Sequence, residues 1–297
     1  MTDADEEPVR GILYVVATPI GNLGDITFRA IEILGDVPLI AAEDTRHTRV
    51  LLDRHGVRTR MTSYHARSPA ARTHALLDHL RSGADLALVS DAGTPGVSDP
   101  GGNLVLAWAA EKGVVVPIPG PSAVLAAVTG SGVAGPRWAF EGFLPRKGRQ
   151  RRERLARVAT EDRGTVLFEA PDRVGATLGD LAHACGADRP AAVCRELTKR
   201  HESIVRDTLG GLRAMVDSGA IPARGEFVIV VGPPLTLGKL AGRNDPDAVV
   251  AARRSVEDLV DAGVARGEAA RRVAASTGLP RRALYGLQGP DQSGSDA

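Results

Sequence analysis

The feature that most constrains this chain is the loop at residues 90–102, with the sequence Ser-Asp-Ala-Gly-Thr-Pro-Gly-Val-Ser-Asp-Pro-Gly-Gly. The apolar run 86–89 before it predicts a buried strand, and the apolar spacing from Leu104 to Trp108 predicts a helix after it. In an open α/β sheet the ligand crevice lies beyond the carboxyl ends of the strands. A loop this long and glycine-rich would present backbone groups to a small polar ligand there. An ordinary turn is the alternative.

Two further strand ends are interrupted in the same way, which argues against an ordinary turn. The predicted strand 11–17 is followed by Thr-Pro-Ile-Gly-Asn-Leu-Gly-Asp, and the predicted strand 114–118 is followed by Pro-Gly-Pro-Ser-Ala. We expect Asp25 to cap the helix after the first loop. Ser122 and Ala123 would offer free N–H groups to an anion at a helix start. The first loop lacks Gly-x-Gly-x-x-Gly spacing, so a dinucleotide site is poorly supported.

The alternation of strands and helices predicts the α/β fold class and about two domains. The chain has 297 residues, of which 43% are apolar and 25% charged, a composition typical of soluble globular proteins. The breaks in the pattern predict a disordered acidic N-terminus at 1–10, α/β domains at 11–130 and 137–232, a hinge at 131–136, a linker at 233–247, a helical module at 248–288 and a disordered tail at 289–297.

Charge and cysteine content exclude several classes of protein. The net charge of +1 produces no global field for nucleic acid, so any basic surface must be local. Cys185 and Cys194 lack the spacing of a zinc site or a disulfide framework, which favours a reducing compartment. The acidic start differs from a signal peptide, and no apolar run approaches the ~20 residues of a membrane span. We expect a cytoplasmic protein with no metal and no membrane contact.

Two local features predict contact with nucleic acid. Residues 146–157 carry a run of arginine and lysine broken among charged residues only by Glu153, and such a run is best neutralised by phosphates. A solvated basic helix is the alternative. Residues 267–285 predict a helix-turn-helix with Arg281 and Arg282 on the first turn of its second helix, where nucleic-acid contacts are made. An αα-hairpin used only for packing or dimerisation is the alternative.

Six segments, taken together and in order, resemble a known family. They are 16–25, 42–46, 90–101, 119–123, 141–148 and 195–199. Each is weak alone, but their joint order is a strong signal. They resemble the 16S rRNA cytidine 2′-O-methyltransferases of the tetrapyrrole-methylase superfamily over residues 11–232, and the tail is similar to that family's helix-turn-helix extension.

The resemblance implies a fold, a cofactor and a substrate. It implies two α/β domains of the tetrapyrrole-methylase type with the cofactor cleft between them, a small helix-turn-helix-like C-terminal module, and a homodimer. The cofactor would be S-adenosyl-L-methionine, and the substrate a cytidine in the decoding region of 16S rRNA in the 30S subunit. Carried over by motif, the cofactor contacts would be Pro19, Gly93, Thr94, Val97, Ser98, Ser122, Ala123, Ala170, Pro171 and Gly232. The RNA contacts would be Arg146, Lys147, Arg149, Arg151, Arg152, Arg281 and Arg282.

Methylation of a ribose hydroxyl requires the oxygen in line with the methyl group, an acceptor for its proton, and exclusion of water. The sequence leaves the acceptor open. The candidates are Glu43, Asp44, Asp91, Lys199 and Glu202, and Lys199 would need a lowered pKa. Positioning alone, with the proton leaving to water, is the alternative.

Two other functions share parts of this pattern. A small-molecule methyltransferase of the tetrapyrrole type would use the same fold and cofactor, but it has no use for the arginine run or the tail. A helix-turn-helix regulator with a ligand-sensing α/β domain would explain the tail, but it would leave the interrupted strand ends to ligand sensing alone.

Overall fold

The structure is a computed structural model that describes residues 10–99, 101–234, 246–261, 263–277, 279 and 281–284. Two compact units are present, Met1–Pro233 and Pro234–Ala297. The expected disordered N-terminus at 1–10, apart from Arg10, the expected disordered tail at 289–297 and most of the expected linker lie outside the described residues. Among the described residues, no helix combines the length and apolar character needed to cross a bilayer.

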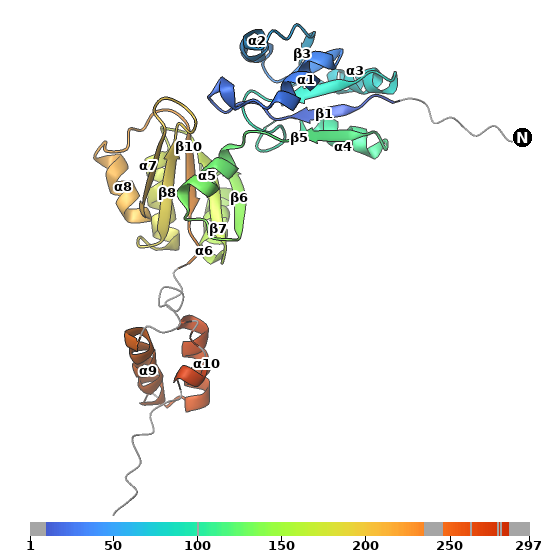
Figure 1. The fold of residues 1–297 in the computed structure, drawn as a ribbon. Coiled ribbons are helices and arrows are strands. Elements are labelled where there is room, and N and C mark those ends of the chain that lie inside the picture. Colours follow the sequence, from blue (N-terminus) through green and yellow to red (C-terminus); the bar gives the residue numbers. More distant parts are fainter. Residues whose placement is uncertain are drawn as a thin grey trace, which may run out of the picture. The chain divides into compact units, whose positions relative to one another are not determined.

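The first half of the larger unit is a parallel sheet covered on both faces (Figure 1). Its strand order is β3-β2-β4-β1-β5, and every pairing is parallel. Sheets of this kind are buried on both sides, which explains the nearly continuous apolar strands. The strands are β1 (Leu13–Val16), β2 (Leu39–Ala42), β3 (Met61–Ser63), β4 (Leu86–Val89) and β5 (Val115–Ile118). Core residues of α1 (Phe28–Asp36) and α2 (Thr45–Arg54) pack on one face, and those of α3 (Ala70–Arg81) and α4 (Gly102–Ala110) on the other.

The second half is a mixed sheet with the order β6-β7-β10-β8-β9. Strands β6 and β7 are parallel, whereas β10 is antiparallel to both β7 and β8. The first residue of β10, Phe227, therefore pairs with Glu169 at the end of β7 and Arg195 at the end of β8. The strands are β6 (Trp138–Phe143), β7 (Gly164–Glu169), β8 (Pro190–Arg195), β9 (Ser203–Thr208) and β10 (Phe227–Val231). One face is covered by α6 (Arg149–Thr160), α7 (Val174–Cys185) and α8 (Leu209–Asp217).

Helix α5 (Ala123–Ser131) joins the two halves. It follows β5 of the first sheet, yet it packs against β8, β9 and β10 of the second (Figure 1). Its buried residues Val124 and Ala127 share a core with Cys194 and Val228. The chain therefore passes from one sheet to the other at residues 119–122, before the helix that we expected to belong to the N-terminal half.

The start of the first helix differs from the prediction. The cap of α1 is Thr27, whose hydroxyl accepts a hydrogen bond from the N–H of Ala30 at 3.1 Å. Asp25 instead closes a short 3-10 turn, Leu23–Asp25, in which the Asn22 side chain accepts from the Gly24 N–H. Because of this extra turn, α1 begins at Phe28, later than the sequence predicted.

The smaller unit is a helical module with its own core. It contains α9 (Pro246–Asp261), α10 (Arg266–Thr277) and the short α11 (Arg281–Leu284). Ala270, Val273 and Ala274 of α10 pack in one cluster with Leu284. Val256 of α9 is buried in the same cluster, so α9 completes the core that two helices would leave open.

Candidate functional site

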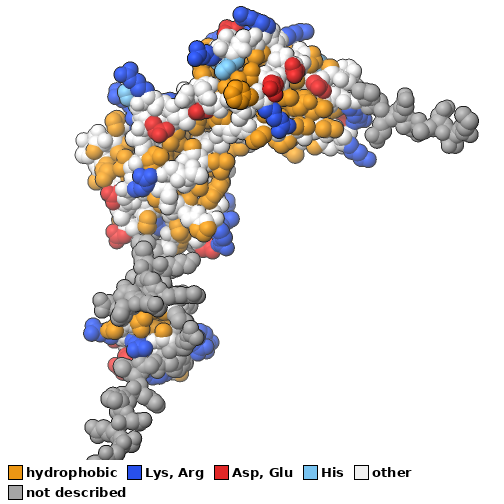
Figure 2. Space-filling view, in the orientation of Figure 1, with side chains coloured by type: hydrophobic (Ala, Val, Ile, Leu, Met, Phe, Trp, Pro, Cys, Tyr) orange, Lys and Arg blue, Asp and Glu red, His pale blue; other side chains and the backbone are white. Residues whose placement is uncertain are grey.

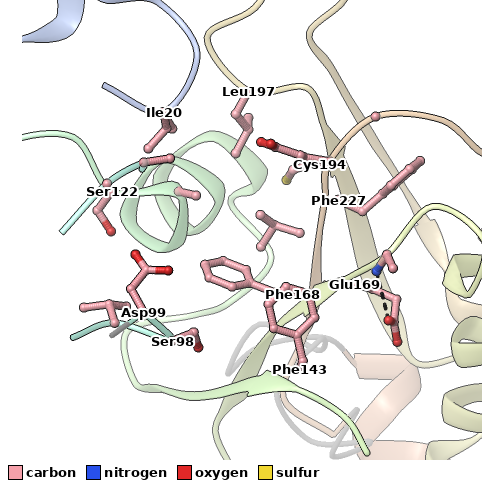
Figure 3. Close-up of a pocket in the computed structure, with 18 of the residues that line it drawn as sticks. Ile20, Ser98, Asp99, Ser122, Phe143, Phe168, Glu169, Cys194, Leu197 and Phe227 are labelled. Atoms are coloured by element: carbon pink, nitrogen blue, oxygen red, sulfur yellow. Dashed lines mark hydrogen bonds between the residues drawn. The ribbon is translucent and has the colours of Figure 1, made fainter. Parts of the chain in front are cut away.

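A cavity of about 360 Å³ opens where strand ends of the two sheets meet (Figure 3). The first half contributes the loop after β4 and Ile20 from the loop after β1. The second half contributes the ends of β7 and β8 and the start of β10. The start of α5, with Ser122 and Ala123, completes the wall. Both halves of the larger unit therefore form one site.

Backbone pairing holds the three interrupted loops together. Thr18 and Gly93 form two reciprocal backbone hydrogen bonds of 2.9 and 3.0 Å, and the Thr18 hydroxyl donates to the carbonyl of Ser90 at 3.1 Å. Gly93 has φ +78°, a backbone angle that favours glycine. The Thr94 hydroxyl donates to the carbonyl of Pro121 at 3.4 Å, which brings in the third loop. The loops after β1 and β4 are thus joined by main-chain pairing, and threonine hydroxyls complete the contacts among the three loops.

Eight of the ten residues expected to contact the cofactor line this cavity: Gly93, Thr94, Val97, Ser98, Ser122, Ala123, Ala170 and Pro171. Pro19 instead lines a separate pocket of about 90 Å³. The prediction that Gly232 lies at the cofactor site is wrong, because Gly232 does not line the cavity. Its N–H donates to Pro190 at the start of β8, because β10 is antiparallel and ends far along the sheet from Phe227.

The cavity also contains residues that sequence reasoning missed. They are Ile20, Ala92, Asp99, Phe143, Phe168, Glu169, Cys194, Leu197, Gly225, Glu226, Phe227 and Val228. Asp99 and Leu197 lie inside recognised motifs, so the signal was present. No motif marks 225–228, and only the direction of β10 brings these residues to the site. Burial raises the pKa of the Cys194 thiol to about 12, so it contributes an uncharged surface.

Asp99 is the acidic side chain of the loop after β4, called the central loop from here on, that faces the cavity (Figure 3). Burial raises its pKa to about 6; a hydrogen bond with Ser90 opposes the shift, and the charges of Glu43 and Asp91 add to it. The carboxylate therefore lies in a site that already carries negative charge. Such a position favours a cationic ligand.

Glu43 and Asp91 tie the loop after β2 to the central loop. The Asp91 N–H donates to Glu43 Oε2 at 3.3 Å, and Asp91 Oδ1 accepts from the N–H of Asp44 at 2.9 Å. Burial raises the pKa of Glu43, which the hydrogen bond from Asp91 partly offsets. Asp44 caps α2, and the side chain of Arg46 holds the pKa of Asp44 well below its usual range. Asp44 is therefore poorly suited to accept a proton.

Lys199 and Glu202 are engaged in their own loop. Lys199 Nζ lies 3.0 Å from both Glu196 Oε1 and Glu226 Oε2. Burial acts to lower the pKa of Lys199, but these two carboxylates outweigh it and the pKa is raised. Lys199 therefore lacks the lowered pKa that a lysine needs in order to act as a base. Glu202 Oε2 accepts from the Thr198 N–H at 2.5 Å and so closes the turn.

The basic run divides into internal and exposed side chains. Arg151 is buried: its guanidinium donates to Asp180 at 2.8 Å, and to Thr177 and the Pro145 carbonyl at 3.0 Å each. Its assignment as an RNA contact is wrong, because the side chain joins α6 to α7. The exposed members of the expected set are Arg146, Lys147, Arg149 and Arg152. In the smaller unit Arg281 is exposed, whereas the side chain of Arg282 lies outside the described residues.

The surface charge is mixed. On the face of the larger unit shown in Figure 2, basic side chains form small groups with acidic ones nearby. This distribution agrees with the net charge of +1. Any attraction of a polyanion must therefore come from local groups such as the start of α6. Within the described part of the chain, no cluster of three or more His, Cys, Asp and Glu side chains could hold a metal ion.

Comparison with known folds defines the class. The family model described as "Tetrapyrrole (Corrin/Porphyrin) Methylases" matches residues 12–213. A solved cobalt precorrin-4 methyltransferase aligns with a TM-score of 0.57 at 18% identity, covering 74% of this chain and 94% of that one. Uroporphyrin-III C-methyltransferase from Thermus thermophilus, solved with S-adenosylhomocysteine, aligns with a TM-score of 0.53 at 20% identity, covering 75% and 97%. The larger unit is thus a tetrapyrrole-methylase fold.

Closer relatives narrow the class. A Synechocystis sp. protein called ribosomal RNA small subunit methyltransferase I is 46% identical to this chain, and the alignment covers 93% of this chain and 97% of the relative. The Bacillus subtilis protein of that name is 37% identical, with 93% of each chain covered. The protein of that name from Haemophilus influenzae is 40% identical over 93% of this chain and 95% of the relative. The chain belongs to the ribosomal RNA small subunit methyltransferase I family. The family resemblance and the two-sheet fold expected from the six segments are confirmed.

The burial of Arg151 yields a prediction about stability. Arg151→Met should lower the free energy of unfolding by about 2 kcal/mol, because Asp180 and Thr177 lose their partner in a packed interface. Urea denaturation measures this value. The matched variant Arg152→Met, at an exposed position, should change it by less than about 0.5 kcal/mol. Equal losses in the two variants would contradict the internal role of Arg151.

Proposed function

We propose that this protein transfers a methyl group from S-adenosyl-L-methionine to the ribose 2′-hydroxyl of a cytidine in the decoding region of 16S rRNA. The proposed substrate is the 30S subunit, and the proposed enzyme is a cytoplasmic homodimer. The observation that carries the proposal is the convergence of three interrupted loops, the third of which includes the start of α5, on one cavity of about 360 Å³. The names of the relatives and the S-adenosylhomocysteine in a neighbour of the same fold support it.

The residues of the cavity fit this cofactor. S-adenosyl-L-methionine carries an ammonium, a carboxylate and an apolar-faced adenine, and when bound it supplies an activated methyl group on a sulfonium. The Asp99 carboxylate would take the cationic part. N–H groups at the start of α5, beside Ser122 and Ala123, would take the carboxylate. Phe143 and Phe168, whose ring centroids lie 5.6 Å apart, provide an apolar wall against which the adenine would pack.

The hydroxyl proton has two candidate acceptors among the predicted set. Glu43 and Asp91 lie at the strand ends of the first sheet and are held by each other and by Asp44. The raised pKa of Glu43 brings its proton affinity closer to the range of a general base at neutral pH. Release of the proton to water stays the alternative. In either case the loops act by orienting the ribose.

The exposed part of the basic run would bind rRNA phosphates. Arg146, Lys147, Arg149 and Arg152 are exposed at the entry to α6, and Arg149 is paired with Glu153 at 2.5 Å. Arg281 would add a contact from the smaller unit. The proposed homodimer would cover an exposed apolar side chain such as Phe28 of α1, which is 87% accessible.

The function is tested with radiolabelled S-adenosyl-L-methionine and four acceptors: 30S subunits lacking the modification, free rRNA, DNA and a porphyrinoid. We expect label in the small subunit, and digestion to nucleosides should place it on the 2′-oxygen of a cytidine. Label in the porphyrinoid would support the small-molecule alternative instead. Absence of label from all RNA acceptors would refute the proposal.

The position of Asp99 predicts a pH-dependent cofactor affinity. A proton on Asp99 competes with a cationic ligand, so affinity for S-adenosyl-L-methionine should be full well above pH 6 and fall as the pH drops below about 6. Asp99→Asn should weaken binding about tenfold at pH 8 and remove this pH dependence. Calorimetry measures both. Asp36→Asn, at an exposed helix end, is the control and should match the wild type. An unchanged pH profile in Asp99→Asn would contradict the assignment.

The exposed basic residues predict a separation of RNA binding from cofactor binding. Replacing Arg146, Arg149 and Arg152 with Glu should abolish methylation of subunits, because attraction to phosphates becomes repulsion. Affinity for S-adenosyl-L-methionine and the unfolding midpoint should not change, since these side chains are exposed and are not part of the cavity lining. Filter binding and methyl transfer provide the measurements. Wild-type activity in this variant would exclude the start of α6 from the RNA surface.

A further inference from the structure

Lys199 joins loops that belong to different sheets. We propose that it is a positioning residue, which holds the loop after β1 against the loop after β8 and thereby fixes the wall of the cavity around the methyl donor. The inference rests on the proposed function for the identity of the donor. It assigns to Lys199 a role other than that of a proton acceptor, which its raised pKa disfavours.

The side-chain stem of Lys199 lies directly on Gly21. A Cβ atom built on Gly21 would lie 2.4 Å from Lys199 Cγ and 2.7 Å from Cε, distances that real contacts do not allow. Gly21 belongs to the loop after β1, and Lys199 follows β8. Their neighbours Ile20 and Leu197 are both buried in one cluster, and both line the cavity (Figure 3). The contact therefore closes one end of the site.

The ammonium group anchors the stem. It lies 3.0 Å from Glu196 Oε1 and 3.0 Å from Glu226 Oε2. Glu196 and Glu226 are themselves joined, because the Glu196 N–H donates to the Glu226 carbonyl and the Glu226 N–H donates to Glu196 Oε1, each at 2.9 Å. The side chain of Lys199 thus connects the loop after β8, the residue before β10 and the loop after β1.

The backbone of this loop is strained, and its surroundings hold it in place. Glu196 has φ +52° and Thr198 has φ +66°, angles that non-glycine residues rarely adopt. Arg195 maintains the loop by donating to the Arg224 carbonyl at 2.7 Å and the His201 carbonyl at 3.2 Å. Strain of this kind is typical of ligand clamps, where the backbone must present a side chain in one orientation. Here it presents Leu197 to the cavity and Lys199 to Gly21.

The consequence is geometric. Transfer of a methyl group depends on alignment, and small displacements of the donor reduce the rate strongly. Ile20 is carried by a loop of the first sheet, whereas most of the opposite wall belongs to the second sheet. Without a fixed contact between these loops, the two sides of the cavity could shift relative to each other and the donor would not be held in one position. Lys199 supplies that contact without touching the reacting atoms.

The test is a double-mutant cycle between Gly21→Ala and Lys199→Ala, with affinity for S-adenosylhomocysteine measured by calorimetry on the full chain. Gly21→Ala should weaken binding about tenfold, because the new methyl group displaces the lysine stem. Lys199→Ala should also weaken binding, because the anchor is lost. In the Lys199→Ala background, Gly21→Ala should cost clearly less than it does in the wild type, because only the strain of alanine at φ +158° remains. Gly56→Ala, at φ +70° and with no atom within 4 Å of the added Cβ, is the control for backbone strain.

Kinetics on 30S subunits separates positioning from simple loss of structure. Both single variants should raise the KM for the donor while the unfolding midpoint stays near that of the wild type. The KM of the double variant should lie close to that of Lys199→Ala and should not show the sum of the two single effects. Two results would overturn the inference: the same tenfold loss from Gly21→Ala whether or not Lys199 is present, or unchanged donor affinity in both single variants. Failure of the wild type to bind S-adenosylhomocysteine would instead refute the proposed function.

Discussion

The backbone pair between Thr18 and Gly93 is the interaction on which the site depends. Its two hydrogen bonds join the loops after β1 and β4, which are neighbouring parallel strands. Gly93 adopts φ +78° at this point, and its would-be Cβ lies 3.4 Å from Ile20 and 3.8 Å from the Pro121 carbonyl, so the three loops approach one another around it. Main-chain pairing of this kind positions a ligand without relying on flexible side chains. It also explains why these loops are rich in glycine and proline.

The second sheet completes the site through strand direction. Because β10 is antiparallel to β7 and β8, its first residues lie beside the last residues of those two strands. A parallel β10 would have brought Gly232 to the site instead of Phe227. The packing of α5 on this sheet then fixes the third loop against the second half. The cavity is therefore a product of topology as much as of motif.

Features of the site that depend on the local backbone conformation could be predicted from the sequence, and the three interrupted loops are of this kind. Glycine and proline spacing revealed the loops at 18–25, 90–102 and 119–123, because these residues restrict the main chain directly. The direction of β10 depends on pairing between distant segments, so the sequence offered no signal for Glu226 or Phe227. Arg151 and Arg152 are chemically identical in the sequence. Only the helical phase of α6 against α7 makes one internal and leaves the other exposed.

The proposed cofactor site and the proposed RNA surface carry opposite charges. The cavity carries Asp99, with Glu43 and Asp91 near enough to raise its pKa, whereas exposed basic side chains lie at the entry to α6. A cationic donor is attracted to the first region and a phosphate backbone to the second. A carboxylate beside the sulfonium would stabilise the donor more than the transition state, in which that charge is lost, and would slow the transfer. The acidic wall therefore serves the reaction best by binding the ammonium group, which keeps its charge throughout, and by repelling phosphates so that the uncharged ribose enters.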